Sequence, residues 1–455
     1  MSNVALKNSP NDARSAFAKT LDALSNPLLA ILLAFVLGAV IIAITSGNIS
    51  TVPVAYIGLI EGAFFKTRGL SESLVATIPY VLASLAVALG FKAGLFNIGV
   101  EGQFYIGSLT AAAVGAAFHD LPALIHLPLV LIAAALGGAV WGAIPGILKA
   151  KTGAHEVINT IMMNYIAYRL TEFLVSNVLR DKASSAVQTI RISPNAELWN
   201  MASVPARLTD PLNAIFIALL LAITTFFFAR WLVLRTRVAA RFQTAAQKRA
   251  FTTALTFMVA LAAFFFLPLL TQTVWPWTDP YDRLHIGLFL APAAAVSVAW
   301  LLNKTTIGFE LRTVGANPSA AQYAGINIGK NIVLAMALSG ALAGLAGAIE
   351  VLGVSICRCL PLFFSAGYGF DSIAIALLAR ADAIGILPSS FLFGALRNGA
   401  DLMELRSGVS KHVISLIQAL VLLFVAAPAI VRYLTRQKTK ADAVADAPLT
   451  RGWGR

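Results

Sequence analysis

Runs of about 20 consecutive apolar residues recur along this 455-residue chain, and they constrain its fold more than any other feature. A helix needs about 20 such residues to cross a hydrocarbon layer about 30 Å thick, since each residue rises about 1.5 Å. Transmembrane β-strands would instead alternate apolar and polar residues over about ten positions. Because 58% of the residues are hydrophobic and 12% are charged, the sequence predicts an all-α polytopic membrane protein embedded in a lipid bilayer.

About twelve candidate spans can be recognised by length and hydropathy. They cover residues 27–46, 74–91, 102–118, 127–149, 156–177, 213–233, 251–272, 285–303, 329–352, 369–380, 384–399 and 412–431. The two segments between 369 and 399 are short, so they can also be read as half-helices that form a hairpin. Residues 1–26 are polar and mildly basic, unlike a cleaved signal peptide, and we expect the first span to remain as an anchor.

Basic residues gather between the predicted spans. The net charge of +13 could indicate nucleic-acid binding, but cytoplasmic loops of membrane proteins also collect Lys and Arg. The segment after the sixth span carries five basic residues and no acidic one: Arg235, Arg237, Arg241, Lys248 and Arg249. We therefore predict no nucleic-acid partner. We place this loop, both termini and residues 303–327 in the cytoplasm, and residues 176–210 outside.

Glycines and cysteines give two further structural expectations. Gly138, Gly142 and Gly146 recur at helical spacing, as do Gly340, Gly344 and Gly347. Such spacing lets helix backbones approach closely, although glycine is also common in membrane helices. The two cysteines, Cys357 and Cys359, are separated by one residue. We predict that they are unpaired packing residues, because this spacing makes a disulfide geometrically poor.

Polar groups interrupt the apolar pattern between Gly90 and Gln103. Asn97, Glu101 and Gln103 stand here among glycines, between two apolar runs. Irregular polar backbone at membrane depth is tolerated where protein or a watery cavity satisfies it, which makes these residues candidates for a substrate pathway. A cytoplasmic turn with solvated charges explains the same pattern, and both interpretations remain open.

The fifth span also carries polar residues on one side. Glu156, Asn159 and Asn164 fall on one face at about 100° per residue. Polar groups in a membrane helix usually face the bundle interior, so we predict a second part of the pathway, with hydrogen bonding between helices as the alternative. His155 and Glu156 begin a zinc-protease pattern, but its second histidine is replaced by Asn159, and we expect no metal site.

Asp371 begins another apolar run, after Gly367 and Gly369. Its carboxylate could cap the helix that follows and interact favourably with the helix dipole. It could equally contact substrate or form part of a gate, since it stands at a helix end within the membrane. Asp371 is therefore both a capping candidate and a pathway candidate.

Residues 306–326 have the features of a short surface helix. Asn317 suits the N-cap, Pro318 the first helical position and Gly325 the terminator of a helix over 319–323. Such an element could dock into a groove of a partner protein or serve as a plain linker. A phosphate-binding loop is absent, because the pattern that ends at Lys330 has the wrong spacing and Asn331 replaces the required Ser or Thr. ATP would therefore be hydrolysed by another subunit.

At these positions the chain resembles ABC importer permeases of the branched-chain amino acid, ribose and nucleoside superfamily. The nearest resemblance is to the nucleoside or simple-sugar group that works with basic-membrane-protein type binding lipoproteins. It is carried by the segments 96–103, 154–165, 306–326, 339–347 and 367–394.

The resemblance implies a core of about ten transmembrane helices, a second homologous permease subunit, a cytoplasmic ABC ATPase and an external substrate-binding lipoprotein. It places the ATPase coupling site on Gly308, Arg312, Gly315, Asn317, Ala320, Ala321 and Gly325. On this basis we expect Gly315→Trp to leave the chain folded while uncoupling it from the ATPase.

One stretch departs from the family pattern. Members usually pass directly from the sixth span to the coupling segment, whereas here two further spans intervene, which we interpret as an inserted, lipid-facing hairpin. The expected division of the chain is a leader (1–26), a first half of the core (27–233), an inserted hairpin with a basic loop (234–303), a coupling segment (304–328), a second half (329–433) and a tail (434–455).

The sequence thus predicts a permease of the bacterial inner membrane that imports nucleosides or related simple sugars by alternating access. Catalytic residues, cofactors and metals are not expected in this subunit, since ATP would bind to the partner. An ion-coupled secondary transporter is the alternative, which would hold substrate and ion sites near the midplane. An integral-membrane enzyme is disfavoured, because the sequence shows no cluster of catalytic groups.

Overall fold

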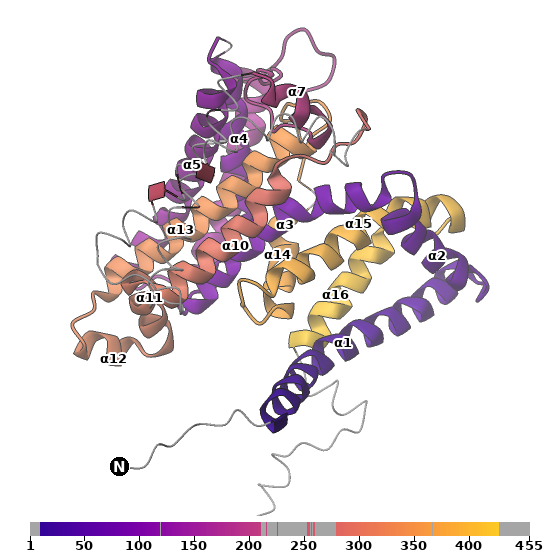
Figure 1. Cartoon of the computed structure of the whole chain (residues 1–455), viewed down its shortest axis with the longest axis horizontal. Coiled ribbons are helices and arrows are strands. Elements are labelled where there is room, and N and C mark those ends of the chain that lie inside the picture. The colour runs from indigo at the N-terminus through magenta and orange to yellow at the C-terminus, as the bar shows by residue number, and fades with distance from the viewer. Residues whose placement is uncertain are drawn as a thin grey trace, which may run out of the picture.

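A bundle of helices forms the body of the protein (Figure 1). The structure is a computed structural model that describes residues 10–210 and 279–426, apart from 119 and 366, with a few isolated positions between these two ranges. In the first range the helices are α1 (Pro10–Ser46), α2 (Thr51–Ile60), η1 (Glu61–Phe65), α3 (Gly69–Lys92), α4 (Val100–Ala117), α5 (Ala123–Thr152), α6 (Glu156–Phe173), η2 (Leu174–Val178), η3 (Met201–Ser203) and α7 (Val204–Leu208).

In the second range the helices are α10 (Gly287–Lys304), α11 (Thr306–Ala316), α12 (Pro318–Tyr323), α13 (Ile328–Ile349), η5 (Glu350–Val354), α14 (Tyr368–Leu378), α15 (Ile386–Ser407) and α16 (His412–Ala426). Strand pairing within the described residues is limited to three isolated bridges. The predicted all-helical membrane architecture is therefore confirmed.

Five helices in the described part of the chain are long and apolar enough to cross a membrane. They correspond to the predicted spans at 27–46, 74–91, 127–149, 285–303 and 329–352, with bounds that differ by a few residues for most of them. The helix α1 already begins at Pro10, within the expected leader. The sequence did not predict α2, which is short and apolar, or α11. The predicted spans at 213–233 and 251–272 lie outside the described residues.

The hairpin predicted between 369 and 399 is formed by α14 and α15. With 11 residues, α14 is about 17 Å long and too short to cross the hydrocarbon layer alone. The chain turns at Arg380 and Ala381, both in the left-handed region with φ of 52° and 53°. However, α15 has 22 residues. The interpretation as two half-helices thus holds for α14 and is wrong for α15.

The glycine rows bring three helices into close contact. A Cβ on Gly138 of α5 would overlap the carbonyl oxygen of Gly340 on α13, and a Cβ on Gly107 of α4 would overlap the backbone of Gly344. Close approach at both glycine rows is therefore confirmed. The central helix α3 lies beside this group and forms the core of the bundle. In its most apolar stretch of 18 residues, 83% of the residues are buried.

The loops of the bundle gather at two opposite ends. At one end, the turn after α3 packs against α11, where a Cβ on Gly94 would lie 2.8 Å from Cα of Gly315. At the other end, Gln188 pairs with Pro361 and Asn200 pairs with His285. Figure 1 shows α12 at the lower left and α7 at the top. Residues 303–327 and 176–210 therefore lie at opposite ends of the bundle.

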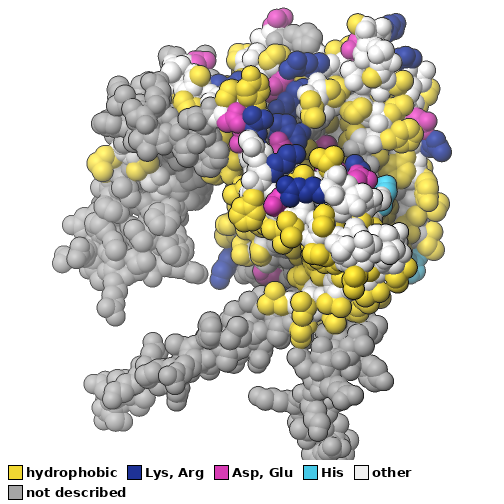
Figure 2. Space-filling view, turned by 90° about the vertical axis from the view of Figure 1, so that its right-hand side faces the viewer, with side chains coloured by type: hydrophobic (Ala, Val, Ile, Leu, Met, Phe, Trp, Pro, Cys, Tyr) yellow, Lys and Arg dark blue, Asp and Glu magenta, His cyan; other side chains and the backbone are white. Residues whose placement is uncertain are grey.

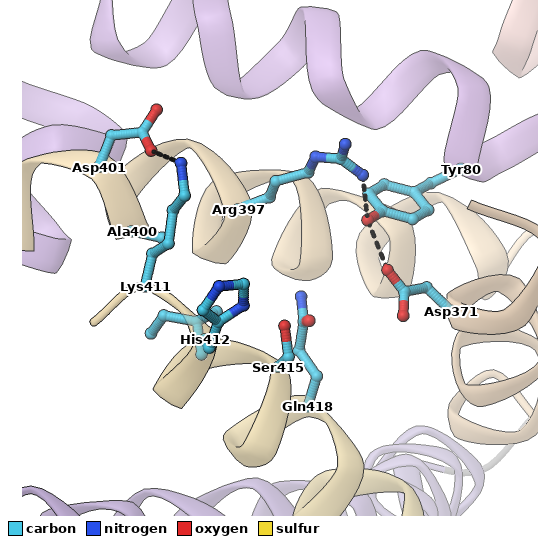
Figure 3. Close-up of a pocket in the computed structure, with 10 residues that line it drawn as sticks. Tyr80, Asp371, Arg397, Ala400, Asp401, Lys411, His412, Ser415 and Gln418 are labelled. Carbon is cyan, nitrogen blue, oxygen red and sulfur yellow. Dashed lines mark hydrogen bonds and ion pairs between the residues drawn. The ribbon is translucent and has the colours of Figure 1, made fainter. Parts of the chain in front are cut away.

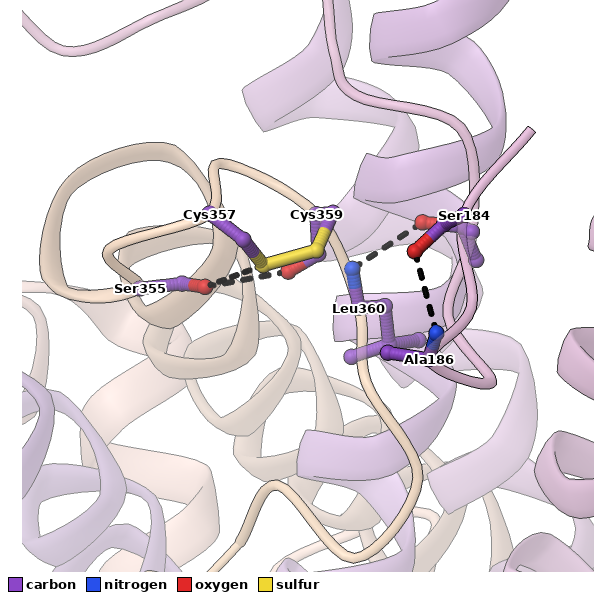
Figure 4. The surroundings of a disulfide bond; sticks show 7 residues. Ser184, Ala186, Ser355, Cys357, Cys359 and Leu360 are labelled. Atoms are coloured by element: carbon purple, nitrogen blue, oxygen red, sulfur yellow. Dashed lines mark hydrogen bonds between the residues drawn. A yellow bond between two sulfur atoms is a disulfide. The ribbon is translucent and has the colours of Figure 1, made fainter. Parts of the chain in front are cut away.

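The prediction for the cysteines is wrong, because Cys357 and Cys359 form a disulfide (Figure 4). Their Cα atoms lie 5.1 Å apart, within the usual range for a disulfide of about 4.4–6.8 Å. Arg358 between them has φ of 51°. This left-handed residue turns the chain so that the two side chains meet, which the spacing alone did not reveal.

Candidate functional site

Glu101 anchors the start of α14. Its side chain is 2% exposed, and it accepts hydrogen bonds from the Ser365 hydroxyl at 2.6 Å and from the Gly369 backbone N–H. A Cβ on Gly369 would overlap the backbone of Glu101, so the two helices touch at this point. The carboxylate thereby satisfies an N–H group that the first turn of α14 cannot pair internally.

Asn97 and Gln103 form a second buried cluster, beside α13. Asn97 Nδ2 donates to Gln103 Oε1 at 3.0 Å and to Ser339 Oγ at 2.9 Å. The Ser339 hydroxyl in turn donates to the Ala86 carbonyl at 2.7 Å. This cluster links the loop after α3 to α4 and α13.

The polar residues of α6 have separate partners. Asn164 Oδ1 accepts from the Gly102 N–H at 2.8 Å, and its Nδ2 donates to the Ile98 carbonyl at 3.0 Å. Glu156 pairs with Lys149 on α5. Asn159 Nδ2 is buried and has no hydrogen-bond partner among the described residues. Glu101, Glu156 and Asn164 therefore contact neighbouring helices, whereas no such contact is found for the Asn159 amide nitrogen in the described part of the chain. None of these residues lines the cavity described next.

A cavity of about 340 Å³ opens between α3, α14, α15 and α16 (Figure 3). Its lining residues are Tyr80, Asp371, Arg397, Ala400, Asp401, Lys411, His412, Ile414, Ser415 and Gln418. This volume is at the lower end of the range typical of small-molecule pockets.

Tyr80 holds together the charged groups on one side of this cavity. Its hydroxyl donates to Asp371 Oδ2 at 2.8 Å and accepts from Arg397 Nη1 at 3.0 Å. The guanidinium carbon of Arg397 lies 4.2 Å from the ring centroid of Tyr368, a distance at which cation–π attraction is significant. Asp371 and Arg397 are therefore fixed in orientation by aromatic neighbours.

The opposite side of the cavity is formed by α16. His412, Ser415 and Gln418 recur every three residues and point toward Arg397 and Asp371 in Figure 3. Lys411 pairs with Asp401 at 3.4 Å.

The space-filling view in Figure 2 shows a face where Lys and Arg side chains gather beside acidic ones, surrounded by hydrophobic side chains.

Of the seven predicted pathway residues, Asp371 alone lines the cavity. Tyr80, Arg397, Ser415 and Gln418 were not predicted. Arg397 could have been found, because an ionisable residue inside a predicted span indicates a functional site. The hydroxyl of Tyr80 gave no such signal, since aromatic residues are frequent in apolar helices.

The predicted coupling segment consists of two capped helices. Thr305 caps α11, because its Oγ1 accepts a hydrogen bond from the Gly308 N–H at 3.0 Å. Asn317 caps α12 in the same way, because its Oδ1 accepts from the Ala320 N–H at 3.0 Å. Gly325 ends the segment with φ of 76°. The predicted N-cap and terminator of α12 are therefore confirmed.

The two faces of this segment differ in burial. Gly308 and Ala321 are buried, whereas Ala320 is exposed and Tyr323 is 95% exposed. Arg312 contributes a buried Nε that has no partner in the described part of the chain. The segment thus keeps one face on the bundle and presents α12 outward.

The expectation for Gly315→Trp is wrong. A Cβ on Gly315 would lie 2.5 Å from the Lys92 carbonyl oxygen and 2.6 Å from the backbone of Ala93. A tryptophan would force α11 away from the end of α3. This variant therefore disturbs the fold and does not isolate the docking surface.

Comparison with known proteins places these features in context. Residues 69–426 match the family described as branched-chain amino acid transport system / permease component. The chain is 38% identical over 425 residues to the guanosine ABC transporter permease protein NupP of Bacillus subtilis. The matched region covers 93% of this chain and 99% of that protein.

Two further relatives have similar coverage. The nucleoside ABC transporter permease protein NupB of Lactococcus lactis is 31% identical, over 94% of this chain and 96% of its own. The glucose ABC transporter permease protein TsgB13 of Haloferax volcanii is 30% identical, over 88% and 87%. No solved structure matches the chain significantly.

Proposed function

Because this chain belongs to the branched-chain amino acid transport system / permease component family, and is a multi-pass permease subunit of an ABC importer, we propose that its substrates are nucleosides. The observation that carries this proposal is the 38% identity to a guanosine permease along 93% of the chain. Simple sugars are the second candidate, supported by the relative named for glucose.

An ABC permease works with an ATPase and with a substrate-binding partner. We propose that the ATPase docks on α11 and α12, and that the coupling residues Gly308, Arg312, Gly315, Asn317, Ala320, Ala321 and Gly325 transmit its movement. The close packing of Gly315 against the turn after α3 supports this role, because a displacement of α11 would then move α3 as well.

We assign the two ends of the bundle to the two sides of the membrane. The end with α12 faces the cytoplasm of a bacterial cell, as do both termini, and the end with residues 179–210 and 355–365 faces outward across the inner membrane. An external binding lipoprotein delivers substrate to that outer end, and a second homologous permease completes the pathway. ATP is hydrolysed by the partner ATPase, and this chain performs no catalysis.

We further propose different roles for the polar residues predicted from sequence. Asp371 contacts the pathway, whereas Asn97, Glu101, Gln103 and Asn164 hold the surrounding helices in register through their buried hydrogen bonds. Roles in the pathway for Glu156 and Asn159 remain predictions.

The division of the chain into core halves, hairpin and coupling segment also remains a proposal. The second span of the proposed hairpin is α10, which buries Ala291, Ala295 and Val298 and exposes Phe289 and Trp300. One face of α10 thus packs on the bundle while the other is free to contact lipid.

Substrate competition tests the proposed function. The permease, its ATPase and its binding lipoprotein are reconstituted in vesicles that contain ATP, and uptake of labelled guanosine is measured with unlabelled competitors. We expect excess inosine, adenosine or uridine to reduce uptake, and ribose or glucose to leave it unchanged. Uptake of labelled glucose or ribose, with no uptake of any nucleoside, would replace nucleosides by simple sugars as the substrate class.

A further inference from the structure

We propose that the cavity between α3, α14, α15 and α16 is a transit site that binds an uncharged nucleoside through Asp371, Arg397, Ser415 and Gln418. The inference rests on the proposed function and adds to it a place and a charge selectivity.

The formal charges around the cavity cancel. Asp401 pairs with Lys411 at 3.4 Å. Asp371 and Arg397 are joined through the Tyr80 hydroxyl at 2.8 Å and 3.0 Å. The four charged side chains that line the cavity, Asp371, Arg397, Asp401 and Lys411, therefore sum to zero. A charged solute would add a net charge to the cavity, which is costly to bury. An uncharged polar solute meets no such cost.

Several polar groups at the cavity are free to bind a ligand. The side chains of His412, Ser415 and Gln418 make no hydrogen bond within residues 10–210 and 279–426, although Gln418 is 7% exposed. Of the two Asp371 carboxylate oxygens, Oδ2 accepts the hydrogen bond from Tyr80. The other oxygen, Oδ1, accepts no hydrogen bond from the described residues. These polar groups line the cavity, where a ligand or water can satisfy them.

These groups complement the edge of a nucleobase. A carboxylate only accepts hydrogen bonds, a guanidinium only donates them, and an amide does both. A ligand that fits presents N–H donors to Asp371 and a carbonyl acceptor to Arg397 or Gln418, as guanine does with its neighbouring N–H and carbonyl groups. The volume of about 340 Å³ suits a ligand of this size. A nucleoside monophosphate would add negative charge to a cavity whose charged lining side chains already sum to zero.

Thiol labelling tests whether solute occupies the cavity. Ser415→Cys places a thiol in the cavity wall, and Leu416→Cys places one on the neighbouring residue of α16, which is 50% exposed and does not line the cavity. Both variants are assembled with the ATPase and binding lipoprotein in vesicles and treated with a small water-soluble thiol reagent. We expect guanosine to slow the labelling of Ser415→Cys severalfold, and neither guanosine 5′-monophosphate nor glucose to do so. The labelling rate of Leu416→Cys should not depend on guanosine.

A second variant tests recognition itself. Gln418→Leu keeps the approximate size of the side chain and removes both hydrogen-bonding groups. We expect its guanosine uptake to fall about tenfold, the effect of losing one or two hydrogen bonds to a buried ligand. Co-purification with the ATPase and an unchanged elution volume establish that this variant is folded.

The outcomes separate this inference from the proposed function. If the unmodified transporter takes up guanosine while guanosine leaves Ser415→Cys labelling unchanged, or while a folded Gln418→Leu variant transports at the unmodified rate, the cavity is not the transit site. Equal protection by guanosine and its monophosphate would overturn the charge selectivity. Failure of the unmodified transporter to take up any nucleoside would overturn the proposed function, and with it the ligand assigned to this cavity.

Discussion

A buried carboxylate such as Glu101 is tolerated inside a membrane helix only because it has partners. Its two oxygens accept hydrogen bonds from Ser365 and from the Gly369 N–H. Removing one partner of a buried hydrogen bond leaves the other unsatisfied, which costs about 1–3 kcal/mol. Glu101 therefore contributes to stability through the group it satisfies at the start of α14.

We predict that Glu101→Ala destabilises the protein by about 1–3 kcal/mol and that Glu101→Gln does so less, because the amide oxygen still accepts one bond. The apparent melting temperature in detergent measures both effects. Glu172→Ala is the matched control, since its ion pair with Arg169 is largely exposed and is worth less than about 1 kcal/mol. Equal melting temperatures for Glu101→Ala and Glu172→Ala would contradict the role assigned to Glu101.

His285 provides a pH-dependent test in the loop before α10. Burial, with the nearby Arg358 and Arg283, lowers the pKa of His285 to about 3, whereas an unfolded histidine has a pKa of about 6.5. The unfolded chain therefore binds the extra proton between these two values, and the folded chain loses stability as the pH falls below about 6.5.

We predict that lowering the pH from 7 to 5 removes about 2 kcal/mol of stability through His285 alone. His285→Asn keeps an acceptor for the Gly287 N–H, which now bonds Nδ1 at 3.2 Å, and cannot titrate. Melting temperatures across this pH range should therefore decline less steeply for the variant. Parallel declines would show that His285 does not remain neutral in the folded protein.

At the level of residues, sequence reasoning identified polar groups better than it identified their roles. Asp371 stood out because a carboxylate begins an apolar run. Its partners come from α3 and α15, 291 residues before it and 26 residues after it in the numbering. Only the folded bundle brings Tyr80, Asp371 and Arg397 together, and no local pattern contains that information.

The close contact of α4, α5 and α13 is the strongest packing feature among the helices. A Cβ on Gly344 would overlap the carbonyl oxygen of Ala134, whereas a Cβ on Gly329, in the same helix, would meet its nearest atom at an ordinary 3.6 Å. These two glycines therefore provide a matched pair of sites on α13.

We predict that Gly344→Val destabilises the protein by about 1–3 kcal/mol or more, because overpacking forces α13 away from α5. Gly329→Ala should leave the stability within about 0.5 kcal/mol. Melting temperature and the yield of monodisperse protein report the difference. A stable, monodisperse Gly344→Val variant would show that α5 and α13 do not touch at this glycine.

The α12 helix is small but carries the proposed docking surface. Tyr323 is 95% exposed at its end, and an exposed aromatic residue beside a rigid, capped helix is typical of a binding hot spot. We predict that Tyr323→Ala weakens co-purification of the ATPase at least about tenfold, without changing the melting temperature.

Tyr281→Ala serves as the control for this experiment. Tyr281 is 75% exposed at the opposite end of the bundle, so its removal should not affect ATPase binding. If the two variants retain the ATPase equally well, docking does not depend on Tyr323.

Elements were predictable where the sequence pattern is local. Apolar length located the spans, and Asn317 with Gly325 located α12, because capping depends on neighbouring residues. The short α2 was missed because its apolar run is soon followed by the polar residues Glu61 and Lys66. The helix α15 extends to Ser407, past polar residues that we had placed outside the span. Tertiary packing, not hydropathy, fixes these boundaries.

For the whole molecule, the family and the helical architecture followed from sequence, whereas the cavity and the disulfide did not. The cavity requires the relative placement of four helices from both halves of the chain. The disulfide requires the turn at Arg358. Both depend on backbone geometry that hydropathy and residue spacing do not encode.

The central claim for the assembled transporter is that ATP hydrolysis by the partner ATPase drives transport. Guanosine uptake into sealed vesicles tests this claim directly. With the ATPase and binding lipoprotein present, we predict uptake against a concentration gradient when ATP is supplied on the ATPase side, and none with a non-hydrolysable analogue or with a proton or sodium gradient alone. Uptake driven by an ion gradient in vesicles that contain this chain without the ATPase would contradict the account.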